Sequence, residues 1–461
     1  MGRLNELGAC GQSVWMDFMK RSFVESGELR ALIERDGLKG ATSNPSIFEK
    51  AIAESDEYDA ALKKLQSSGD HSVSEIYEDL AFEDIRNAAD ALRPVYDRTQ
   101  GADGFISLEC SPYLANDTEA TIAEALHLWR EVARPNLMVK VPGTEAGLPA
   151  IRALIAQGIN VNITLLFSVD VYEQVADAYM SGLEDLLQAG GDVSKVASVA
   201  SFFVSRIDTA VDRLLERAKD EGAAQLKGKA AIANAKLAYA LFESLVAGAR
   251  WGRLAAAGAK VQRLLWASTS TKNPAYKDTV YVEELVGRDT VNTMPPTTLD
   301  AFRDHGVVTP DAIERDLPQA HADLAALADY GISLDDVTRE LTEDGVRLFA
   351  DAFDKLLGAV AQRRLALVDG AQAGLTIDMG SAEAQKRYEE ELESWRRGGN
   401  IRRLWAGDAS LWTGADEDRW LGWLRIVDAE LASVAELEDF AAHVKRQGYS
   451  DVLLVGMGGS S

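Results

Sequence analysis

The sequence predicts a closed (β/α)8 TIM barrel with extra C-terminal helices, followed by a partial second α/β segment. Over the first ~300 residues, short apolar segments alternate with helical stretches, as in a parallel α/β fold. Eight such segments occur, and 461 residues leave room for a barrel of about 250 residues plus additions. Tryptophan then becomes frequent, which indicates a second segment. An open doubly wound sheet is the alternative that the strand count alone leaves open.

The predicted strands are short and rich in apolar and β-branched residues. They span residues 13–17, 40–44, 104–110, 136–141, 159–166, 196–204, 261–267 and 289–294, and helices such as 117–133 and 169–189 separate them. Residues 299–367 are predicted to be helical. We expect a helix cap at Thr309-Pro310 and a long amphipathic helix over 334–368 that closes off the barrel.

The composition changes after the predicted barrel domain, residues 1–367. Five of the nine tryptophans follow it, namely Trp395, Trp405, Trp412, Trp420 and Trp423. A linker is expected at 368–380, where glycines loosen the chain, and a second segment at 381–461. Within that segment, 452–455 is predicted as a buried strand and 456–461 as a glycine-rich turn of the kind that opens a helix around a phosphate. We interpret it as the incomplete start of another α/β domain; an ordinary terminal strand with a flexible tail is the alternative.

Composition excludes several classes of function. The net charge of −25 opposes binding to nucleic acid and acidic membranes, so an anionic substrate needs basic groups at its own site. Two cysteines, Cys10 and Cys110, offer no disulfide framework or zinc spacing, and no signal peptide or membrane-spanning run is apparent; a cytoplasmic protein is predicted. No histidine pair has metal-ligand spacing and no G-x-G-x-x-G follows an early strand, so neither a metal nor another cofactor is expected.

The most informative single residue is Lys140. It interrupts the apolar run N-L-M-V-K-V-P-G at 136–143, which is typical of a strand buried on both faces. Burial disfavours the charged ammonium, and the free amine is a nucleophile that can form a Schiff base with a ketone. The structural alternative is that Lys140 pairs with a buried carboxylate or reaches solvent at the strand end.

Polar side chains gather at the predicted carboxyl ends of the strands, where barrel enzymes carry their catalytic groups. These residues are Asp17, Thr42, Ser43, Asn44, Glu109, Lys140, Asn162, Thr164, Ser201, Arg206, Ser268, Ser270 and Lys272. Each has a structural alternative: Asp17 and Asn44 could cap helices, Glu109 could only pair with Lys140, and Arg206 could pair with an acid of its own helix. Two acids, one amine and several amides and hydroxyls on one face nevertheless favour carbonyl chemistry run by a lysine.

Five ordered motifs resemble those of the transaldolase family. They are A-T-S-N-P-S-I-F at 41–48, N-L-M-V-K-V-P-G-T at 136–144, N-I-T-L-L-F-S at 162–168, S-F-F-V-S-R-I at 201–207 and A-S-T-S-T-K-N-P at 267–274. The resemblance covers roughly residues 1–367. It implies a pentose-phosphate enzyme that moves a dihydroxyacetone unit from sedoheptulose 7-phosphate or fructose 6-phosphate to glyceraldehyde 3-phosphate or erythrose 4-phosphate.

The resemblance also implies a role for each catalytic residue. Lys140 would form the Schiff base with the C2 carbonyl of the ketose. Asp17 would act as acid and base on the C4 hydroxyl, whose deprotonation breaks the C3–C4 bond. Glu109 and Thr164 would hold a water that shuttles protons during imine formation and hydrolysis.

The remaining implied roles concern binding. Asn44 and Asn162 would hydrogen-bond the dihydroxyacetone unit. The distal phosphate would be bound by Ser201, Arg206, Ser268 and Lys272. Arginine suits phosphate through its fork of donors. Lys272 departs from the pattern of the family, because many transaldolases carry an arginine at this position.

Phe203 bears on the nearest alternative. Fructose 6-phosphate aldolases share the barrel and the lysine but resemble a variant with tyrosine where Phe203 stands. Since phenylalanine cannot activate water, the three-carbon unit should wait for an acceptor, which favours transfer over cleavage. A non-catalytic sugar-phosphate binding module is a further alternative, although it would not need Lys140, Glu109 and Asp17 together.

The tail from about residue 374, ending in V-G-M-G-G-S-S, resembles the start of a phosphoglucose isomerase. The whole sequence resembles the fused transaldolase/phosphoglucose isomerase polypeptides, stopped as the isomerase core begins. Isomerase activity is therefore expected to be absent, with the missing isomerase domain as a partner in the parent polypeptide. The other expected partners are sugar phosphates, with neither nucleic acid nor membrane, and the oligomeric state stays open.

Overall fold

Eight parallel strands close into a barrel in sequence order, with β8 pairing back onto β1. They are β1 (Gln12–Asp17), β2 (Gly40–Thr42), β3 (Phe105–Glu109), β4 (Leu137–Pro142), β5 (Val161–Leu166), β6 (Ser198–Phe203), β7 (Arg263–Ala267) and β8 (Thr290–Met294). All eight predicted strands are confirmed, and an open doubly wound sheet is excluded. This computed structural model describes residues 2–69, 71–218, 220–367 and 377–449, together with Asp451 and Leu453.

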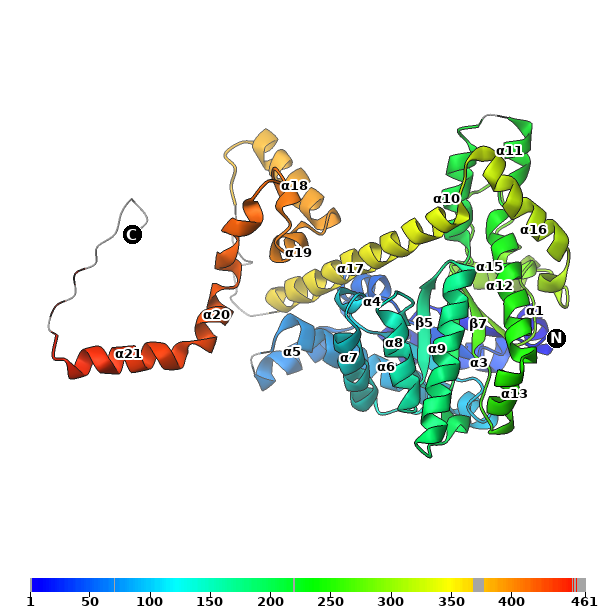
Figure 1. The fold of residues 1–461 in the computed structure, drawn as a ribbon, viewed down its shortest axis with the longest axis horizontal. Helices are drawn as coiled ribbons and strands as arrows, with labels where there is room; N and C mark the ends of the chain where they lie inside the picture. Colours follow the sequence, from blue (N-terminus) through cyan, green and yellow to red (C-terminus); the bar gives the residue numbers. More distant parts are fainter. Residues whose placement is uncertain are drawn as a thin grey trace. The chain divides into compact units, whose positions relative to one another are not determined.

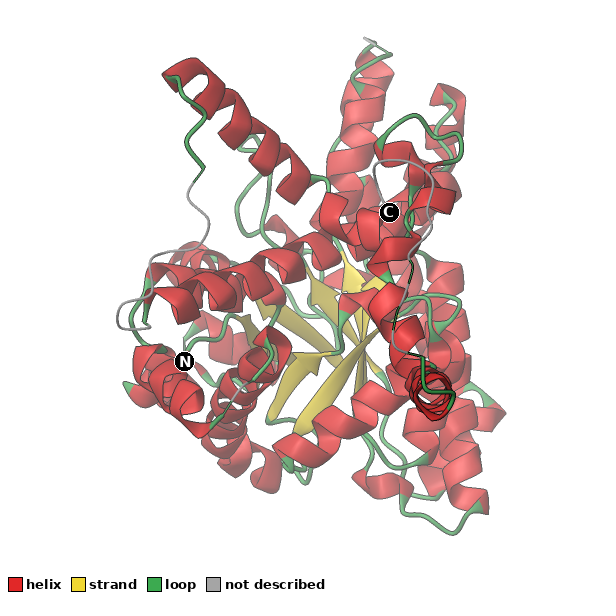
Figure 2. Ribbon diagram, turned by 90° about the vertical axis from the view of Figure 1, so that its left-hand side faces the viewer, coloured by secondary structure: helices red, strands yellow, loops and turns green. Residues whose placement is uncertain are grey.

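Helices surround the strands (Figure 2). They are α1 (Arg3–Ala9), α2 (Arg21–Glu25), α3 (Glu28–Asp36), α4 (Pro45–Glu54), α5 (Asp59–Ser68), α6 (Val73–Arg98), α7 (Thr118–Val132), α8 (Gly147–Ala156), α9 (Val169–Gln188), α10 (Ser205–Leu215), α11 (Glu221–Leu226), α12 (Ala230–Ala247), α13 (Ala249–Ala256), α14 (Val280–Glu283) and α15 (Pro296–His305), with short 3-10 turns η1 (Pro112–Leu114) and η2 (Val193–Lys195). The predicted helices at 117–133 and 169–189 are confirmed as α7 and α9. Asp117 begins α7 by accepting a hydrogen bond from the Ala120 amide at 3.0 Å, as an N-cap residue should.

The expected helix cap at Thr309-Pro310 is wrong. Residues 306–309 are irregular, and the next elements are η3 (Ala312–Glu314), α16 (Leu317–Ala326) and η4 (Leu327–Tyr330). Asp311 and Asp316 have φ of 54° and 55°, a left-handed conformation that interrupts a helix at both points. The Ile313 amide donates to the Val286 carbonyl at 3.2 Å, which ties this segment to the barrel instead.

The predicted long amphipathic helix is confirmed as α17 (Leu334–Ala366). It runs past α10, α4 and α5 (Figure 1), and it also contacts η1, α6 and strand β5. Gly345 allows the closest approach, because a Cβ there would lie 2.8 Å from a methyl carbon of Leu165 in β5. The helix therefore lies against the end of the barrel where the strands finish.

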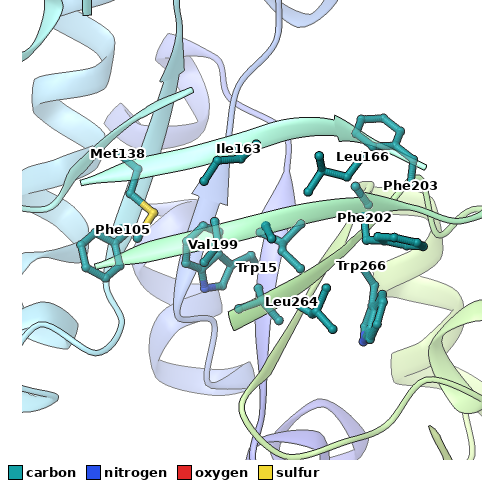
Figure 3. Close-up of a cluster of buried hydrophobic side chains, with 14 of the residues drawn as sticks. Trp15, Phe105, Met138, Ile163, Leu166, Val199, Phe202, Phe203, Leu264 and Trp266 are labelled. Atoms are coloured by element: carbon teal, nitrogen blue, oxygen red, sulfur yellow. The ribbon is translucent and has the colours of Figure 1, made fainter. Parts of the chain in front are cut away.

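The core is one continuous cluster of buried apolar side chains, which come from residues between Leu4 and Val360. Figure 3 shows part of this cluster, with labelled side chains from β1, β3, β4, β5, β6 and β7. Gly40 is required for this packing, since a Cβ on it would lie 2.4 Å from the Trp15 ring. The Trp15 indole donates to Asp103 at 3.0 Å, and Arg263 pairs with the same carboxylate at 3.0 Å. These buried polar groups sit on the amino side of the strands and leave the carboxyl side for other chemistry.

One helix of the described chain, α12, is long and apolar enough by composition to cross a membrane, and half of that window is buried. It packs against α9, α10 and α16 of the barrel wall. Its buried Asn234 donates to the Phe167 carbonyl at 2.8 Å, and its buried Lys236 donates to the Arg315 carbonyl at 2.9 Å. We interpret α12 as a core helix of the barrel.

The chain divides into two units, Met1–Thr376 and Ile377–Ser461. The described elements of the second unit are α18 (Ala382–Arg397), α19 (Asn400–Trp405), η5 (Ala409–Leu411), η6 (Glu417–Trp420), η7 (Gly422–Leu424), α20 (Ile426–Ala432) and α21 (Val434–Arg446). Of the expected linker, residues 368–376 lie outside the described residues. The turn expected at 456–461 also lies outside them, as does most of the strand expected at 452–455; within that strand the described Leu453 is exposed and not in a strand.

Candidate active site

The centre of the site is a buried ion pair between Lys140 and Glu109. The two residues are register partners on β4 and β3, and Asn162 of β5 is the next partner in the same row. Lys140 Nζ lies 2.5 Å from Glu109 Oε1, and the side chains are 7% and 9% exposed. Nζ also donates to the Ser43 carbonyl at 3.4 Å. The predicted burial of Lys140 is thus confirmed, and the structural pairing with Glu109 is present as well.

Burial raises the pKa of Glu109; the Lys140 cation opposes this effect, and the Asp17 carboxylate adds to it. Glu109 Oε2 and Thr164 Oγ1 are buried without a hydrogen-bond partner among the described residues. Thr164 precedes Leu165, whose φ of 63° accompanies a break in register between β5 and β6. A bulge of this kind redirects a side chain at a functional site.

Asp17 is the last residue of β1 and does not cap a helix, because α2 begins at Arg21 with Lys20 as its N-cap. Thr42 Oγ1 donates to Asp17 Oδ1 at 2.8 Å and lies 3.1 Å from Thr293 Oγ1. Thr42 of β2 therefore holds this carboxylate, and Thr293 of β8 lies within hydrogen-bond distance of the same Thr42 hydroxyl. The charge of Asp17 acts on Glu109 as well as on the cations described below.

The two amide side chains that are predicted to bind substrate, Asn162 and Asn44, have different hydrogen-bond partners. Asn162 is fully buried: it donates to Ser107 Oγ at 3.0 Å, and Ser201 Oγ donates to its Oδ1 at 2.6 Å. The Ser201 hydroxyl thus orients Asn162 in this structure. Asn44 is the N-cap of α4, where its Oδ1 accepts from the Ile47 amide at 3.2 Å. The structural alternative for Asn44 is therefore confirmed, although its amide nitrogen is not used by the cap.

Two cations flank the same end of the barrel. Arg206 at the start of α10 lies over the Phe203 ring, with its Cζ 5.2 Å from the ring centroid. It makes no hydrogen bond or ion pair with the described residues, so the alternative that Arg206 pairs with an acid of its own helix, such as Asp208, is wrong. Burial lowers the pKa of Arg206, and Asp17 opposes the shift. Partial burial and the Arg206 cation lower the pKa of Lys272, which donates to Ser270 Oγ at 2.8 Å.

Residues 268–279, which follow β7, carry Ser268, Ser270 and Lys272. Ser268 has a φ of 56°, and its Oγ lies 3.0 Å from Ser205 Oγ at the start of α10. Further along, Tyr276 donates to Asp212 of α10 at 2.5 Å. Two side-chain contacts therefore connect the loop to α10, and they fix the position of Lys272 relative to Arg206.

A second buried carboxyl lies beside the site but outside the predicted set. Burial raises the pKa of Glu124 on α7 to about 7; the Ser111 amide, which donates to it at 3.0 Å, opposes this, and Glu78 adds to it. Because the folded-state pKa exceeds the unfolded one, the protonated form contributes stability at pH below about 4.5. That contribution is lost as the pH rises through about 7.

We therefore expect Glu124→Gln to be more stable than the parent protein at pH 8, on the order of 1 kcal/mol, and to differ little at pH 4.5. Glutamine keeps an acceptor for the Ser111 amide. Urea unfolding at both pH values measures this difference. Equal stability of the two proteins at pH 8 would contradict the raised pKa of Glu124.

Phe349 of α17 completes the surroundings of Lys140 and was not predicted. Its ring centroid lies 5.7 Å from Lys140 Nζ. The amphipathic pattern of α17 indicates a buried face but not which barrel residue that face covers. Among the described residues, no group of three or more histidine, cysteine, aspartate or glutamate side chains is placed to hold a metal ion.

Barrel enzymes carry their active sites at the carboxyl ends of the strands, and the buried Lys140–Glu109 pair lies at that end of this closed barrel. Residues 14–360 match the family model described as Transaldolase/Fructose-6-phosphate aldolase. The chain belongs to this family.

Individual relatives agree with the family match. The chain is 50% identical to the transaldolase of Parafrankia sp. (strain EAN1pec) over 360 residues, which is 78% of this chain and 97% of the relative. It is 51% identical to the transaldolase of Thermobifida fusca (strain YX) over 360 residues, 78% and 98% of the two chains. Transaldolase 2 of Nostoc punctiforme is 48% identical over 371 residues, and the match covers 78% of this chain and 97% of the relative. The chain is thus a transferase of the transaldolase type, and its second unit lies outside the family match.

Proposed function

We propose that this enzyme moves a dihydroxyacetone unit from a ketose phosphate to an aldose phosphate through a Schiff base on Lys140. The proposed donors are sedoheptulose 7-phosphate and fructose 6-phosphate, and the proposed acceptors are glyceraldehyde 3-phosphate and erythrose 4-phosphate. The observation that carries the proposal is the contact of 2.5 Å between Lys140 and Glu109, both nearly buried at the carboxyl ends of adjacent strands. A buried amine beside a carboxyl can exchange its proton without solvent.

The proposed cycle assigns one task to each group. Glu109 takes a proton from Lys140, whose free amine adds to the C2 carbonyl and loses water to give the imine. Asp17 then removes the proton of the C4 hydroxyl, the C3–C4 bond breaks, and the electron pair passes into the iminium. The unpartnered Glu109 Oε2 and Thr164 Oγ1 supply an acceptor and a hydroxyl where a water could pass protons between them.

Binding of the phosphate is assigned to Arg206 and Lys272, with Ser268 nearby. Arg206 has no anionic partner among the described residues, and partial burial and the nearby Arg206 cation lower the pKa of Lys272. A phosphate would relieve the repulsion between these two cations, which concentrate positive charge at one place in a chain whose net charge is −25. Asn162, held by Ser201, and the free amide nitrogen of Asn44 are proposed to bind the three-carbon unit.

Phe203 supports transfer rather than cleavage. Phe203 is the last residue of β6 and is 7% exposed. Its ring packs against that of Phe167, at a centroid distance of 5.2 Å. A phenyl ring offers no group that would activate water for release of dihydroxyacetone. The carbanion is then retained until an aldehyde arrives.

The test follows product formation from fructose 6-phosphate with and without erythrose 4-phosphate. We expect glyceraldehyde 3-phosphate and sedoheptulose 7-phosphate in equal amounts when the acceptor is present, and almost no free dihydroxyacetone. Release of dihydroxyacetone at the same rate without an acceptor would support the aldolase alternative and contradict the proposal.

Tyr276→Phe tests the phosphate site. Loss of the hydrogen bond to Asp212 should loosen the loop that carries Lys272 and raise the KM for fructose 6-phosphate about 3- to 10-fold, with kcat changed less than about twofold. Initial rates with fructose 6-phosphate and unphosphorylated fructose measure the effect, which should be absent for fructose. Tyr330→Phe is the matched control, because Tyr330 donates to Asp220 at 3.1 Å in an equivalent pair away from the site. An equal rise in KM for fructose 6-phosphate and for fructose would contradict the proposal that this loop binds the phosphate.

We also propose that the second unit is a segment of phosphoglucose isomerase type, fused to the barrel enzyme, and that the chain works in the cytoplasm. The resemblance of its last residues supports the first part, as do the exposed Trp405, Trp412, Trp420 and Trp423, which suit burial against further structure. The free Cys10 and Cys110 support the second part. We expect no interconversion of glucose 6-phosphate and fructose 6-phosphate by this chain, and such activity would contradict the proposal.

A further inference from the structure

Helix α17 turns one narrow face toward the active site. Gly345, Phe349 and Phe353 are spaced four residues apart and so lie on one side of the helix. Gly345 approaches Leu165 of β5, and Phe353 packs edge-to-face against Tyr77 and Tyr113 at centroid distances of 5.5 and 5.4 Å. Phe349 is held between these two contacts and is directed at the amine of Lys140.

The surroundings of the Lys140 amine are therefore of two kinds. Glu109 Oε1 at 2.5 Å and the Ser43 carbonyl at 3.4 Å are polar and belong to the strand ends. The Phe349 ring at 5.7 Å is apolar and comes from α17. The ring is itself half-buried, whereas the Lys140 side chain is 7% exposed, so the ring lies nearer to solvent than the amine does.

We infer that Phe349 determines reaction specificity by keeping water away from the Schiff base, so that the three-carbon unit is transferred rather than released. This inference rests on the proposed function and assigns to α17 a task separate from that of Phe203. The aromatic face is compatible with the ammonium and with the iminium, because both are cations. It offers no proton to the carbanion.

The side reaction to be suppressed is hydrolysis of the enamine that remains after C3–C4 cleavage. A water donates a proton to the carbanion carbon, leaving hydroxide and an iminium. The hydroxide adds to the iminium carbon, the hydroxyl proton of the resulting carbinolamine passes to the nitrogen, and the C–N bond then breaks to release dihydroxyacetone and the free Lys140 amine. One water is consumed for each dihydroxyacetone released. A gap next to Lys140 and Glu109 has polar partners and would take up water, whereas the phenyl ring fills that space.

The experiment measures the partition between dihydroxyacetone release and transfer in a mixture of fructose 6-phosphate and erythrose 4-phosphate, using the full chain. For Phe349→Ala we expect the ratio of release to transfer to rise at least about fivefold. Phe349→Leu keeps an apolar side chain and should lie between the parent protein and the alanine variant. Leu348→Ala is the control, because Leu348 is the preceding residue of α17 and is 47% exposed.

A partition equal to that of the parent protein in the folded Phe349 variants would overturn the inference. If Phe349→Ala does not fold, Phe349→Leu decides alone, with a rise of at least about twofold expected. A lower rate with an unchanged ratio would indicate a structural role and would also overturn it. Failure of the proposed function is distinguishable, because the parent protein itself would then form no adduct on Lys140 and transfer no three-carbon unit.

Discussion

Lys140→Met is expected to abolish transfer, with a loss of activity on the order of 10⁴-fold or more, because no other group can form the imine. Lys236→Met is a matched control: Lys236 is also buried, but it lies in α12 and donates to the Arg315 carbonyl. Steady-state rates with fructose 6-phosphate and erythrose 4-phosphate measure both variants. The control should retain activity in proportion to its folded fraction. A comparable loss of activity in the two variants would indicate that removing any buried lysine lowers the rate, and would contradict a chemical role for Lys140.

The same variant has a consequence for stability. Without Lys140, Glu109 loses its ion pair, and an unpaired buried carboxylate would cost about 3–5 kcal/mol if it stayed ionised. Burial already raises the pKa of Glu109, and the loss of the cation raises it further, so the carboxyl keeps its proton to higher pH in the folded state than in the unfolded state. The stability of Lys140→Met should therefore fall as the pH rises through this pKa. Thermal unfolding at pH 5 and pH 8 should show a larger deficit at pH 8.

Asp17→Asn is expected to separate imine formation from bond cleavage. The amide keeps the size of the carboxylate but cannot accept the proton of the C4 hydroxyl, so kcat should fall about 10²- to 10⁴-fold. Imine formation depends on Lys140 and Glu109, which are unchanged. Borohydride reduction in the presence of fructose 6-phosphate should therefore trap the complete six-carbon sugar on Lys140.

Asp79→Asn, an exposed aspartate of α6, is the control for this experiment and should behave as the parent protein. Intact-mass measurement distinguishes a six-carbon from a three-carbon adduct. A three-carbon adduct formed at the parent rate would show that Asp17 is not the base. The absence of any adduct would show that Asp17 acts before cleavage.

The barrel could be predicted because strands buried on both faces carry apolar runs, and the polar residues that end those runs mark one face of the sheet. The sequence predicts Lys140, Glu109 and Asn162 at strand ends; the three are partners in one row, but Asn162 is the second residue of β5 and not at its carboxyl end. Sequence position could not decide what each polar atom contacts. Asn44 is used as a helix cap, and the Ser201 hydroxyl is bonded to Asn162.

Two features could not be predicted because they depend on contacts between distant segments. The Phe349 contact with Lys140 requires the exact course of α17 across the strand ends, which its amphipathic pattern does not give. The expectation of a helix cap at Thr309-Pro310 rests on a local signal, since proline after threonine is a common helix start. Here, the left-handed Asp311 and Asp316 and the contact with Val286 determine the path instead.

The central claim is that Lys140 forms the Schiff base, and borohydride trapping tests it most directly. The protein is incubated with fructose 6-phosphate, reduced, digested and analysed by peptide mass spectrometry. We predict one sugar-derived adduct, on the peptide that contains Lys140 and absent from Lys140→Met. An adduct on another lysine such as Lys236, or no adduct while transfer continues, would contradict the mechanism.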